Sequence, residues 1–554
     1  MHVVVAGTTD VHGWFEGHRD VPVPYGGLPL FASYVAALRA ANPGHVVVVD
    51  SGDVFQGTLE SNFFEGEPLV KAYNAIGYDA VAVGNHEFDY GPVGPDSVPT
   101  KPEDDPLGAL KRNAANAKWP FLSANIKEKA TGQTPSWMKR STIVTVAGVK
   151  LGIIGLSTPD TPNTTTPENI ASLSFGDPVS ATVAEAADLR ARGADAVIVI
   201  AHMGGRCSDL EDVHDNASCE MEHEVMKYLQ ALPKGTIDGY FAGHTHFQIR
   251  QVIEGVPVVQ GSAYSREFST VDFFVDPKQH RVLRSELRPL TMICRQVFTG
   301  TSTCDPKQAP KGTALVPRMF EGRAIADEPT MAAMLQPYAD RVAAKRNEPL
   351  GIRAAGTLSR NYTGESTLGN PLSDLLREWG GADIGFVNSG GIRSDLHAGD
   401  LKYGDLFEVS PFDNFPALVE MTGQQLLDAL RITSTGERGF LQVSGIRYVV
   451  DYVKDHDKPM PERNRLVSVT LANGQPLDPT ATYKVATIDF LAKGGDALNP
   501  VMNTIPADRK RIDSTTPIRD IYVAMLKQHH SGVPLTPKAE GRITVLNEPP
   551  KAAR

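Results

Sequence analysis

The segment Val46-Val-Val-Val-Asp50-Ser-Gly-Asp53 carries the pattern on which the first half of the chain is built. Its β-branched residues predict a buried strand, and the Asp, Ser and Gly that follow predict an abrupt turn. The same order of apolar run and polar end recurs through the first 290 residues. The runs are Val3–Ala6, Val46–Val49, Ala80–Val83, Leu151–Leu156, Ala196–Ile200, Tyr240–Ala242 and Val256–Val259.

Strands that are apolar along their whole length are typical of sheets covered on both faces. The amphipathic segments Leu28–Ala40 and Val179–Ala191 can supply that cover. We therefore expect an α/β domain with layered sheets. Residues 94–118, which are rich in proline and charge, are expected as an excursion on its surface.

A change of composition marks the end of this domain. From Cys294 to about Arg323 the chain is rich in Thr, Pro, Lys and Gly without periodicity, which indicates a boundary. Residues 328–347 then show helical spacing, and strand-like and helical segments alternate beyond them. We expect domains at 1–325 and 350–546, a connecting helix and hinge at 326–349, and a tail at 547–554.

Bulk composition excludes several classes of protein. The 554 residues are 41% hydrophobic and 21% charged, as in soluble globular proteins. No apolar run approaches the roughly 18 residues of a membrane span, so no transmembrane segment is expected. The net charge of -11 is spread along the chain, which argues against binding a nucleic-acid duplex. The sequence indicates no oligomeric state.

The cysteines bear on the cellular compartment. They fall as two local pairs, Cys207 with Cys219 and Cys294 with Cys304, although four cysteines allow three connectivities. Disulfides persist in oxidising compartments, so export to the periplasm, cell surface or medium is expected. No signal peptide is recognisable in this chain, because Met1 is followed almost at once by a strand-like run. A cytoplasmic protein with free thiols is the alternative.

Candidate metal ligands follow the strand-like runs. In open α/β folds the carboxyl ends of strands share one edge of the sheet, where ligands bind. Polar residues delivered there by five runs can therefore converge. The candidates are Asp10, His12, Asp53, Asn85, His202, His244 and His246.

These residue types indicate a binuclear centre. Imidazole and carboxylate groups without thiolate favour ions of intermediate hardness. The candidates are more numerous than one catalytic ion needs. Any single motif could be an ordinary turn, but their joint order favours two divalent ions, Zn, Mn, Co or Mg. We expect one ion to be bound by Asp10, His12 and His246 and the other by Asn85, His202 and His244, with Asp53 bridging them.

Such a centre can hydrolyse a phosphoester. Two ions can bridge a water, lower its pKa and form a hydroxide that attacks phosphorus. His86, next to Asn85, could then stabilise the phosphoryl group or the departing oxygen. Asp89 could accept the other ring N–H of His86 and fix the imidazole.

The ordered motifs Asp10-x-His12, Gly52-Asp53, Gly84-Asn85-His86-Glu87, His202 and Gly243-His244-Thr-His246 resemble the calcineurin-like metallophosphoesterases. Three later motifs are similar to the 5′-nucleotidase C-terminal domain: Asn388-Ser-Gly-Gly-Ile-Arg393, Ser410-Pro-Phe412-Asp-Asn414 and Asp489-Phe490-Leu-Ala-Lys-Gly-Gly-Asp496. Together they cover most of residues 1–546. The resemblance is to the 5′-nucleotidase, UDP-sugar hydrolase and cyclic-nucleotide phosphodiesterase family. It implies an N-terminal four-layer α/β/β/α sandwich and a smaller mixed α/β C-terminal domain.

The resemblance also implies a nucleotide substrate. Phe412 and Phe490 match positions where two rings sandwich a base, with Asn414 and Gly445 near it. The other implied contacts are Asn388, Asp496 for the ribose hydroxyls and Arg393 for the phosphate. One departure stands in Asn361-Tyr-Thr-Gly-Glu365, where Tyr362 replaces an expected arginine and Arg360 lies nearby. Either Arg360 substitutes, or the phosphate clamp is weaker.

Alternatives remain at the level of function. A 2′,3′-cyclic-nucleotide phosphodiesterase or a UDP-sugar pyrophosphatase would use the same scaffold. A catalytically silent binding module would keep the fold, but intact candidate ligands argue against it. A hydrolase of carrier-bound sulfur esters is the third alternative, which the nucleotide-type motifs disfavour. We expect a 5′-nucleotidase type of phosphohydrolase.

Overall fold

The computed structural model describes residues 1–19 and 21–548. Two compact units are present, and each is described by itself. The first comprises Met1–Pro162 and Glu168–Arg341, and the second comprises Asn163–Pro167 and the chain from Val342 onward. Residues 549–554 of the expected tail lie outside the described residues.

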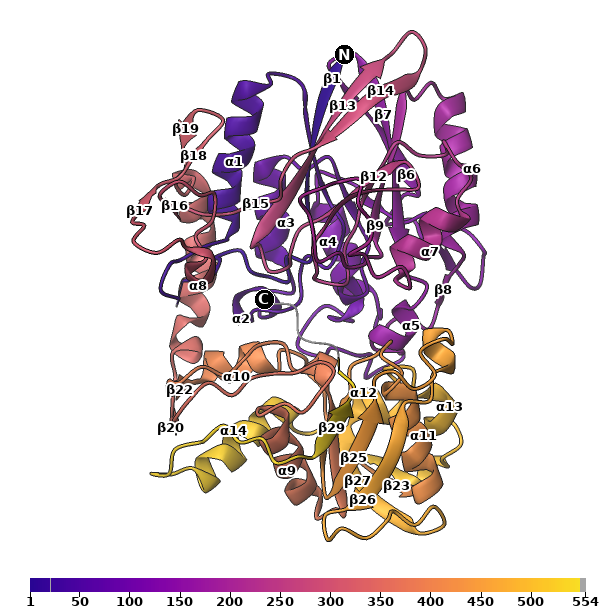
Figure 1. The fold of residues 1–554 in the computed structure, drawn as a ribbon, viewed down its shortest axis with the longest axis vertical. Coiled ribbons are helices and arrows are strands. Elements are labelled where there is room, and N and C mark those ends of the chain that lie inside the picture. The colour runs from indigo at the N-terminus through magenta and orange to yellow at the C-terminus, as the bar shows by residue number, and fades with distance from the viewer. Residues whose placement is uncertain (20, 549–554) are drawn as a thin grey trace. The chain divides into compact units, whose positions relative to one another are not determined.

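One sheet of the first unit carries the N-terminus (Figure 1). Its strands are β1 (His2–Thr8), β2 (Val46–Asp50), β3 (Ala80–Ala82), β4 (Phe121–Leu122), β13 (Glu267–Asp276), β14 (Arg281–Leu287) and β15 (Thr291–Met292). The order is β14-β13-β1-β2-β3-β4, and β15 pairs with β13. β1 to β4 are parallel, so their carboxyl ends share one edge.

A second sheet holds the later predicted strands. Its members are β6 (Ser141–Val146), β7 (Val149–Ser157), β9 (Ala196–His202), β10 (Gly239–Phe241), β11 (Ile249–Ile253) and β12 (Val256–Gln260). They follow the order β11-β12-β10-β9-β7-β6. The four central strands are parallel, and β6 and β11 form antiparallel edges.

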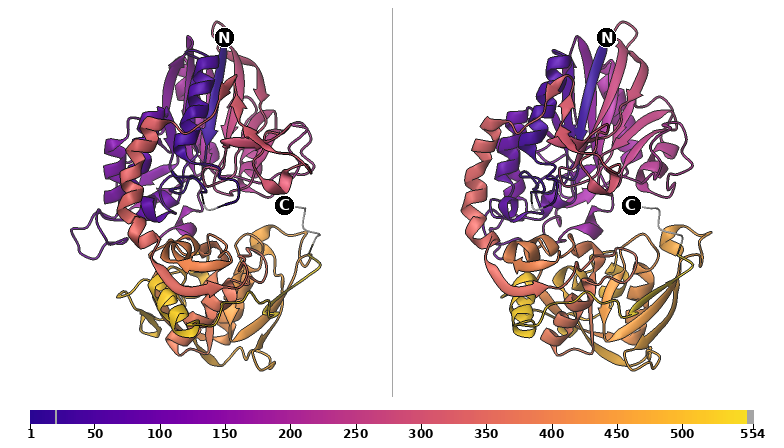
Figure 2. Two further views of the ribbon diagram at one scale, coloured as in Figure 1. Left: turned by 90° about the vertical axis from the view of Figure 1, so that its left-hand side faces the viewer. Right: turned by 60° about the vertical axis from the view of Figure 1, so that its left-hand side comes forward.

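Side-chain alternation shows how the layers pack. In β1, Val3 and Val5 join a core cluster shared with residues of the second sheet, while Val4 and Ala6 join a helical cluster. Strands β1 and β9 are thus buried on both faces. Helices α1 (Leu28–Ala41) and α3 (Glu67–Ile76) cover the first sheet, and α6 (Pro178–Ala191) and α7 (Glu224–Ala231) cover the second (Figures 1 and 2). This confirms the predicted four-layer arrangement.

Short elements complete this part of the chain. They are α2 (Leu59–Asn62), α4 (Gly108–Asn116), α5 (Thr161–Thr164), β5 (Ile126–Glu128), β8 (Leu173–Phe175), β16 (Gln296–Phe298), β17 (Leu315–Pro317), β18 (Met319–Phe320) and β19 (Arg323–Ala324). The expected surface excursion at residues 94–118 thus contains helix α4. Its Ala109 and Leu110 are buried, because they belong to the core beside α3.

From residue 329 onward the chain forms both helices and strands. They are α8 (Pro329–Arg346), β20 (Pro349–Ala354), α9 (Gly369–Gly380), β21 (Ile384–Asn388), β22 (Gly399–Lys402), α10 (Tyr403–Val409), β23 (Pro416–Thr422), α11 (Gly423–Thr433), β24 (Leu441–Ser444), β25 (Ile446–Asp451), β26 (Leu466–Leu471), β27 (Thr482–Ile488), α12 (Asp489–Ala492), α13 (Asn499–Met502), β28 (Lys510–Ile512), α14 (Ile518–His529) and β29 (Ile543–Leu546).

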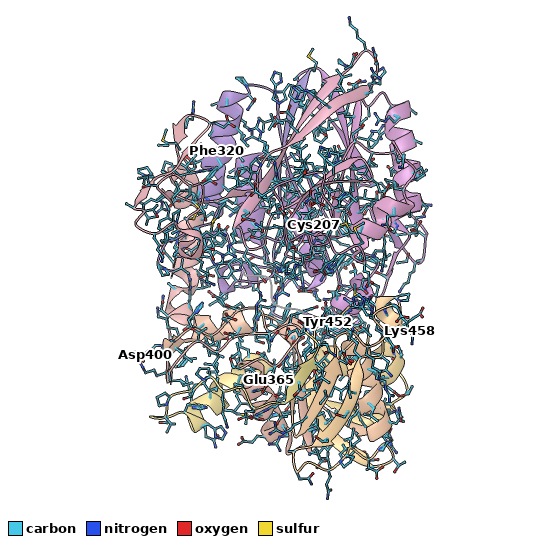
Figure 3. The ribbon with its side chains drawn as sticks, viewed as in Figure 1. Cys207, Phe320, Glu365, Asp400, Tyr452 and Lys458 are labelled. Carbon is cyan, nitrogen blue, oxygen red and sulfur yellow. A yellow bond between two sulfur atoms is a disulfide. The ribbon has the colours of Figure 1, made fainter. Side chains whose placement is uncertain are left out.

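The second unit is a mixed α/β structure, as predicted. One sheet has the order β24-β21-β27-β23-β28, and another the order β26-β25-β29. Helix α9 packs closely on β21, since a Cβ added to Gly385 would lie 2.4 Å from the Ser373 carbonyl oxygen. Glu365, marked in Figure 3, accepts the backbone N–H groups of Glu540 and Gly541 and so fixes the segment before β29.

The structure selects one cysteine pairing. Cys207 is bonded to Cys219 and Cys294 to Cys304, so the described residues contain no free cysteine. Both bridges are local and lie in the first unit. Within the part of the chain that the structure describes, no helix combines the length and apolar character needed to cross a membrane.

Candidate functional site

The predicted metal ligands lie where the parallel strands of the first unit end. Asp10 and His12 follow β1, Asp53 follows β2, and Asn85 follows β3. The rest come from the second sheet: His202 ends β9, and His244 and His246 follow β10. Left-handed backbone conformations mark these loops, since φ is positive at Asp10, His12, Asp53, His244 and His246. Non-glycine residues adopt such φ values rarely, and they cluster at functional sites.

Two groups of donor atoms converge. In each group, Asp10 with His12 and His246, and Asp53 with His202 and His244, the donor atoms lie within 4.8 Å of one another. The His12 and His246 Nε2 atoms are 3.1 Å apart, and His244 Nδ1 lies 3.2 Å from His202 Nε2. Ring nitrogens this close together can bind the same ion. Their chemistry suits a divalent ion of intermediate hardness.

Asp53 joins the two groups. Its Oδ2 lies 2.9 Å from His202 Nε2 and 3.6 Å from His12 Nε2. Asn85 belongs beside the second group, because its Oδ1 is 3.1 Å from His202 Nε2. The structure therefore brings all seven predicted ligands together, with one carboxylate between the two sets.

Neighbouring carbonyl groups set the ring tautomers. Nδ1 of His12 lies 2.8 Å from the Gln56 oxygen, and Nδ1 of His202 lies 2.9 Å from the Ser51 oxygen. Each Nδ1–H can donate to its carbonyl, which leaves the Nε2 lone pair facing the centre. Metal-binding histidines are commonly held in this way. The residues present thus fit a pair of divalent ions.

The two aspartates are ionised in this setting. Burial alone would raise the pKa of Asp10, but the imidazoles of His246 and His202 hold it below its ordinary value. For Asp53, the opposing effect of His202, His86 and His12 outweighs burial and holds the pKa well below its ordinary range. Both side chains are therefore available as carboxylate ligands at neutral pH.

Glu87 supports these loops, a role that the sequence did not reveal. Its carboxylate accepts the N–H groups of Gly84 at 2.6 Å, Asp53 at 2.9 Å and Val54 at 2.7 Å. Burial and the charge of Asp53 raise the pKa of Glu87 to about 8. The backbone N–H groups of Val54 and Asp53 oppose this rise, because they donate to the carboxylate oxygens. The sequence signal that could have indicated this role was the position of Glu87 in the Gly-Asn-His-Glu motif.

Replacing Glu87 with glutamine is expected to weaken metal binding about 10-fold. An amide keeps one accepting oxygen and replaces the other with an NH₂ group, and each buried N–H left without a partner costs about 1–3 kcal/mol. Titration calorimetry with Mn²⁺ measures the effect. Glu185→Gln is the control, because Glu185 is equally buried but binds Arg140 and Ser141. Equal affinities in both variants would contradict the role of Glu87.

The predicted pair His86 and Asp89 lies at the edge of the centre. His86 Nδ1 is 2.6 Å from Asp89 Oδ2, and the His86 backbone N–H donates to Asp53 Oδ1 at 2.9 Å. The His86 and His12 rings are 5.3 Å apart. Nε2 is thus the ring nitrogen that Asp89 does not contact.

In the second unit, some predicted substrate residues lie together. Asn388 donates from Nδ2 to Asp496 Oδ2 at 2.7 Å. The Arg393 guanidinium lies 5.7 Å from the centre of the Phe412 ring. The Phe490 ring covers Gly495, where an added Cβ would lie 2.4 Å from the ring, so Phe490 and Asp496 share one turn.

Gly445 lies apart from Asn388, whereas Asn414 lies near Phe490, because Phe415 and Asp489 exchange hydrogen bonds. Gly445 precedes β25, and its Cα faces the Asp383 carbonyl before β21, whereas Asn388 ends β21. Gly385 pairs with Ser444 and Asn388 with Leu441, so the structure does not bring Gly445 to Asn388. Arg360 is exposed, and its backbone N–H donates to Asp395. The Asn414 carbonyl accepts the N–H of Ile518, at the start of α14.

Tyr362 stands beside the Asn388 loop. Its carbonyl oxygen accepts the Phe440 N–H at 2.8 Å. A Cβ added to Gly439 would lie 2.8 Å from the Tyr362 ring and 3.0 Å from Ser389. The residue found where an arginine was expected therefore packs against glycine backbone.

Comparisons with known proteins agree with this geometry. The family model described as calcineurin-like phosphoesterase matches residues 3–248, and the model described as 5′-nucleotidase, C-terminal domain, matches residues 342–504. Protein UshA of Yersinia enterocolitica is 26% identical over 536 residues, covering 91% of this chain and 88% of the relative. A 5′-nucleotidase of Vibrio cholerae is 27% identical over 524 residues, covering 88% and 84%.

A solved structure is similar over nearly the whole chain. It is the crystal structure of a 5′-nucleotidase precursor from Thermus thermophilus. The likeness covers 99% of this chain and 100% of that one, with a TM-score of 0.77 and 25% sequence identity.

Proposed function

Because the chain belongs to the calcineurin-like phosphoesterases that carry a 5′-nucleotidase C-terminal domain, we propose that it releases phosphate from nucleotides with two divalent metal ions. The family makes it a phosphoric ester hydrolase. The observation that carries the metal proposal is the position of Asp53, whose Oδ2 lies near histidines of both donor groups. A carboxylate in this position can bind both ions.

The side chains of the centre suit an anionic substrate. Asp10 and Asp53 are its carboxylates, and Asn85 supplies a neutral oxygen. Two carboxylates against two divalent ions leave net positive charge. Divalent ions in such a centre activate water and neutralise the charge of phosphate oxygens. The protein holds the ions in fixed positions, and the net positive charge of the centre attracts phosphate.

His86 is proposed to act on the substrate directly. Its contact with Asp89 holds the ring in one orientation and favours the proton on Nδ1 in the neutral form. When His86 carries both protons, Nε2–H can donate to a phosphoryl oxygen or to the leaving oxygen. Asp89 balances the resulting charge.

Selectivity for nucleotides is proposed to come from the second unit. Phe412 and Phe490 would stack on the base, and Asn388 and Asp496 would bind the ribose hydroxyls. Arg393, which lies over the Phe412 ring, would bind phosphate as a planar fork. The hydrogen bond between Asn388 and Asp496 supports a joint role for these two side chains.

Replacing Phe412 with alanine is expected to raise KM for 5′-AMP about 5- to 150-fold, because stacking on a base contributes about 1–3 kcal/mol. KM for ribose 5-phosphate, which has no base, should stay within about twofold of the unmodified value. Steady-state phosphate release measures both. Phe412→Tyr keeps the ring and should restore binding of 5′-AMP. Equal changes for both esters would show that Phe412 acts on the fold or on Arg393 and not on the base.

A second function on the same scaffold is favoured by one observation. Tyr362 occupies the place where a phosphate-binding arginine was expected, and Arg360 is exposed. Weaker binding of the monophosphate group would favour 2′,3′-cyclic nucleotides or UDP-glucose as substrates. Hydrolysis of a panel of 5′-AMP, 3′-AMP, 2′,3′-cyclic AMP, ADP, ATP and UDP-glucose separates the two functions. Phosphate is measured directly for the monoesters, and with a coupled phosphatase for substrates whose hydrolysis leaves a monoester. Highest activity on 5′-nucleotides supports the first, and highest activity on diesters supports the second.

Export is proposed from the disulfides. Both cysteine pairs are bonded and buried in the first unit. Such bonds persist where thiols are not kept reduced, as in the periplasm or outside the cell. This location suits an enzyme that acts on extracellular nucleotides.

A further inference from the structure

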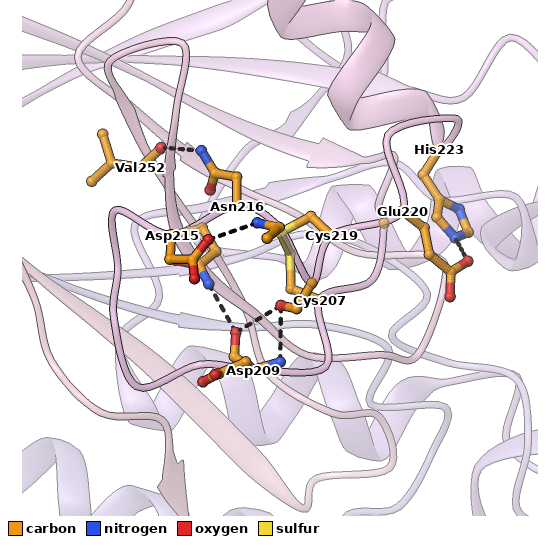
Figure 4. Close-up of a disulfide and its surroundings, with 12 residues drawn as sticks. Cys207, Asp209, Asp215, Asn216, Cys219, Glu220, His223 and Val252 are labelled. Carbon is orange, nitrogen blue, oxygen red and sulfur yellow. Dashed lines mark hydrogen bonds and ion pairs between the residues drawn. A yellow bond between two sulfur atoms is a disulfide. The ribbon is translucent and has the colours of Figure 1, made fainter. Parts of the chain in front are cut away.

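The bridge Cys207–Cys219 closes a loop directly beside the metal centre. Cys207 lies five residues after His202, which ends β9, and the bridge spans 12 residues of sequence. Figure 4 shows the bridge and its surroundings, and both cysteines are at least nine-tenths buried. The loop therefore begins where one ligand-bearing strand stops.

The same segment contacts the loop that carries His244 and His246. The Cys207 N–H donates to the Gln248 carbonyl oxygen, and the Thr245 hydroxyl donates to the Gly205 carbonyl oxygen at 2.7 Å. The Arg206 guanidinium lies 4.7 Å from the centre of the Phe247 ring. Residues 205–207 thus contact three residues that flank the two histidines.

The far end of the bridge holds residues 205–207 in place. The Glu220 N–H donates to the Arg206 carbonyl oxygen at 2.9 Å, and the Arg206 side chain lies 3.4 Å from Glu220 Oε1. Between the cysteines, the loop binds strand β11. Asn216 donates to the Val252 carbonyl oxygen (Figure 4). Gln251 donates to the Asp209 carbonyl oxygen.

We propose that Cys207 and Cys219 are positioning residues for the metal centre. Their bond fixes the segment after His202 against the loop of His244 and His246. That loop needs support, because both histidines have positive φ, which persists only where the surroundings impose it. A bridge supplies it by limiting the conformations open to residues 207–219. The inference rests on the proposed metal centre.

The test compares two disulfide-free variants of the full chain. Cys207→Ser/Cys219→Ser removes the bridge beside the centre. Cys294→Ser/Cys304→Ser removes a bridge of similar span, 10 residues, whose cysteine Cys294 instead contacts Tyr34. Titration calorimetry with Mn²⁺ is expected to show binding about 10-fold weaker in the first variant, and within about twofold of the unmodified chain in the second.

A second measurement does not depend on the ion. Hydrogen exchange of backbone amides in residues 243–248, recorded on the metal-free protein, should be faster in Cys207→Ser/Cys219→Ser than in the other variant. If that double variant does not fold, Arg206→Ala keeps the bridge and removes the contact with Phe247. It should weaken Mn²⁺ binding about threefold or more, in the same direction.

The outcomes distinguish the two proposals. Equal Mn²⁺ affinity and equal exchange in both disulfide variants would overturn the positioning role and leave the metal centre intact. Unchanged affinity in Arg206→Ala, with an unfolded Cys207→Ser/Cys219→Ser variant, would also overturn it. If the unmodified chain binds no Mn²⁺ or Zn²⁺, the proposed function fails. Faster exchange confined to the variant without Cys207–Cys219 would then still support the positioning of the loop.

Discussion

Replacement of Asp53 by alanine is expected to lower phosphate release by about 10³-fold or more. Removing a single electrostatic group from a catalytic site costs up to about 10³-fold, and Asp53 serves both ions. Its Oδ2 lies near His202 and His12, and its Oδ1 accepts the His86 N–H. The replacement should therefore weaken ion binding by both donor groups. Calorimetry should show fewer than two bound ions per chain.

A control for this variant lies at the other end of the same sheet. Asp79 directly precedes β3, and its carboxylate accepts the Val48 N–H. Burial raises the pKa of this carboxyl group. Asp79→Asn is expected to retain two ions and turnover within a few-fold of the unmodified chain. If Asp53→Ala keeps two ions and full turnover, Asp53 does not bridge.

Replacement of His86 by alanine is expected to lower kcat about 10²- to 10⁴-fold, the range for a positioned proton donor or acceptor. Mn²⁺ affinity should change by less than about threefold, because His86 lies in neither donor group. This combination separates a catalytic role from a ligand role. Stopped-time phosphate assays and calorimetry on the same preparation measure the two quantities.

Asp89→Asn is a milder change in the same pair of residues. Asparagine can still contact His86 Nδ1, but it cannot balance the charge of the doubly protonated ring. We expect a smaller loss of kcat than in His86→Ala. If His86→Ala lowered metal affinity as strongly as Asp53→Ala, His86 would be a ligand and the proposed role would be wrong.

The layered fold could be predicted because its strands are apolar on both faces. Val3, Val4, Val5 and Ala6 alternate between two cores, and a strand without a polar face is typical of a sheet covered on both sides. Helix α4 was missed because prolines and charges before it suggest a surface segment. The choice among disulfide connectivities also required the structure, since pairing depends on how the loop after His202 returns along β11.

The metal site was predictable to a similar degree. Parallel strands of one sheet deliver their carboxyl ends to one edge, so the residues after β1, β2 and β3 were expected to lie together. The structure was needed to show that the ligands from β9 and β10, in the second sheet, join them. The role of Glu87 could not be predicted, because it acts on backbone N–H groups whose directions depend on local φ values. The position of Gly445 depended on the register between β21 and β24, which a motif does not encode.

The most direct test of the central claim is phosphate release from 5′-AMP by chelator-treated protein, measured against added Mn²⁺ or Zn²⁺. A binuclear phosphoesterase predicts no activity without ions and a return of activity that levels off at two ions per chain. Full activity in excess chelator, or no activity with any divalent ion on any phosphate ester, would contradict it.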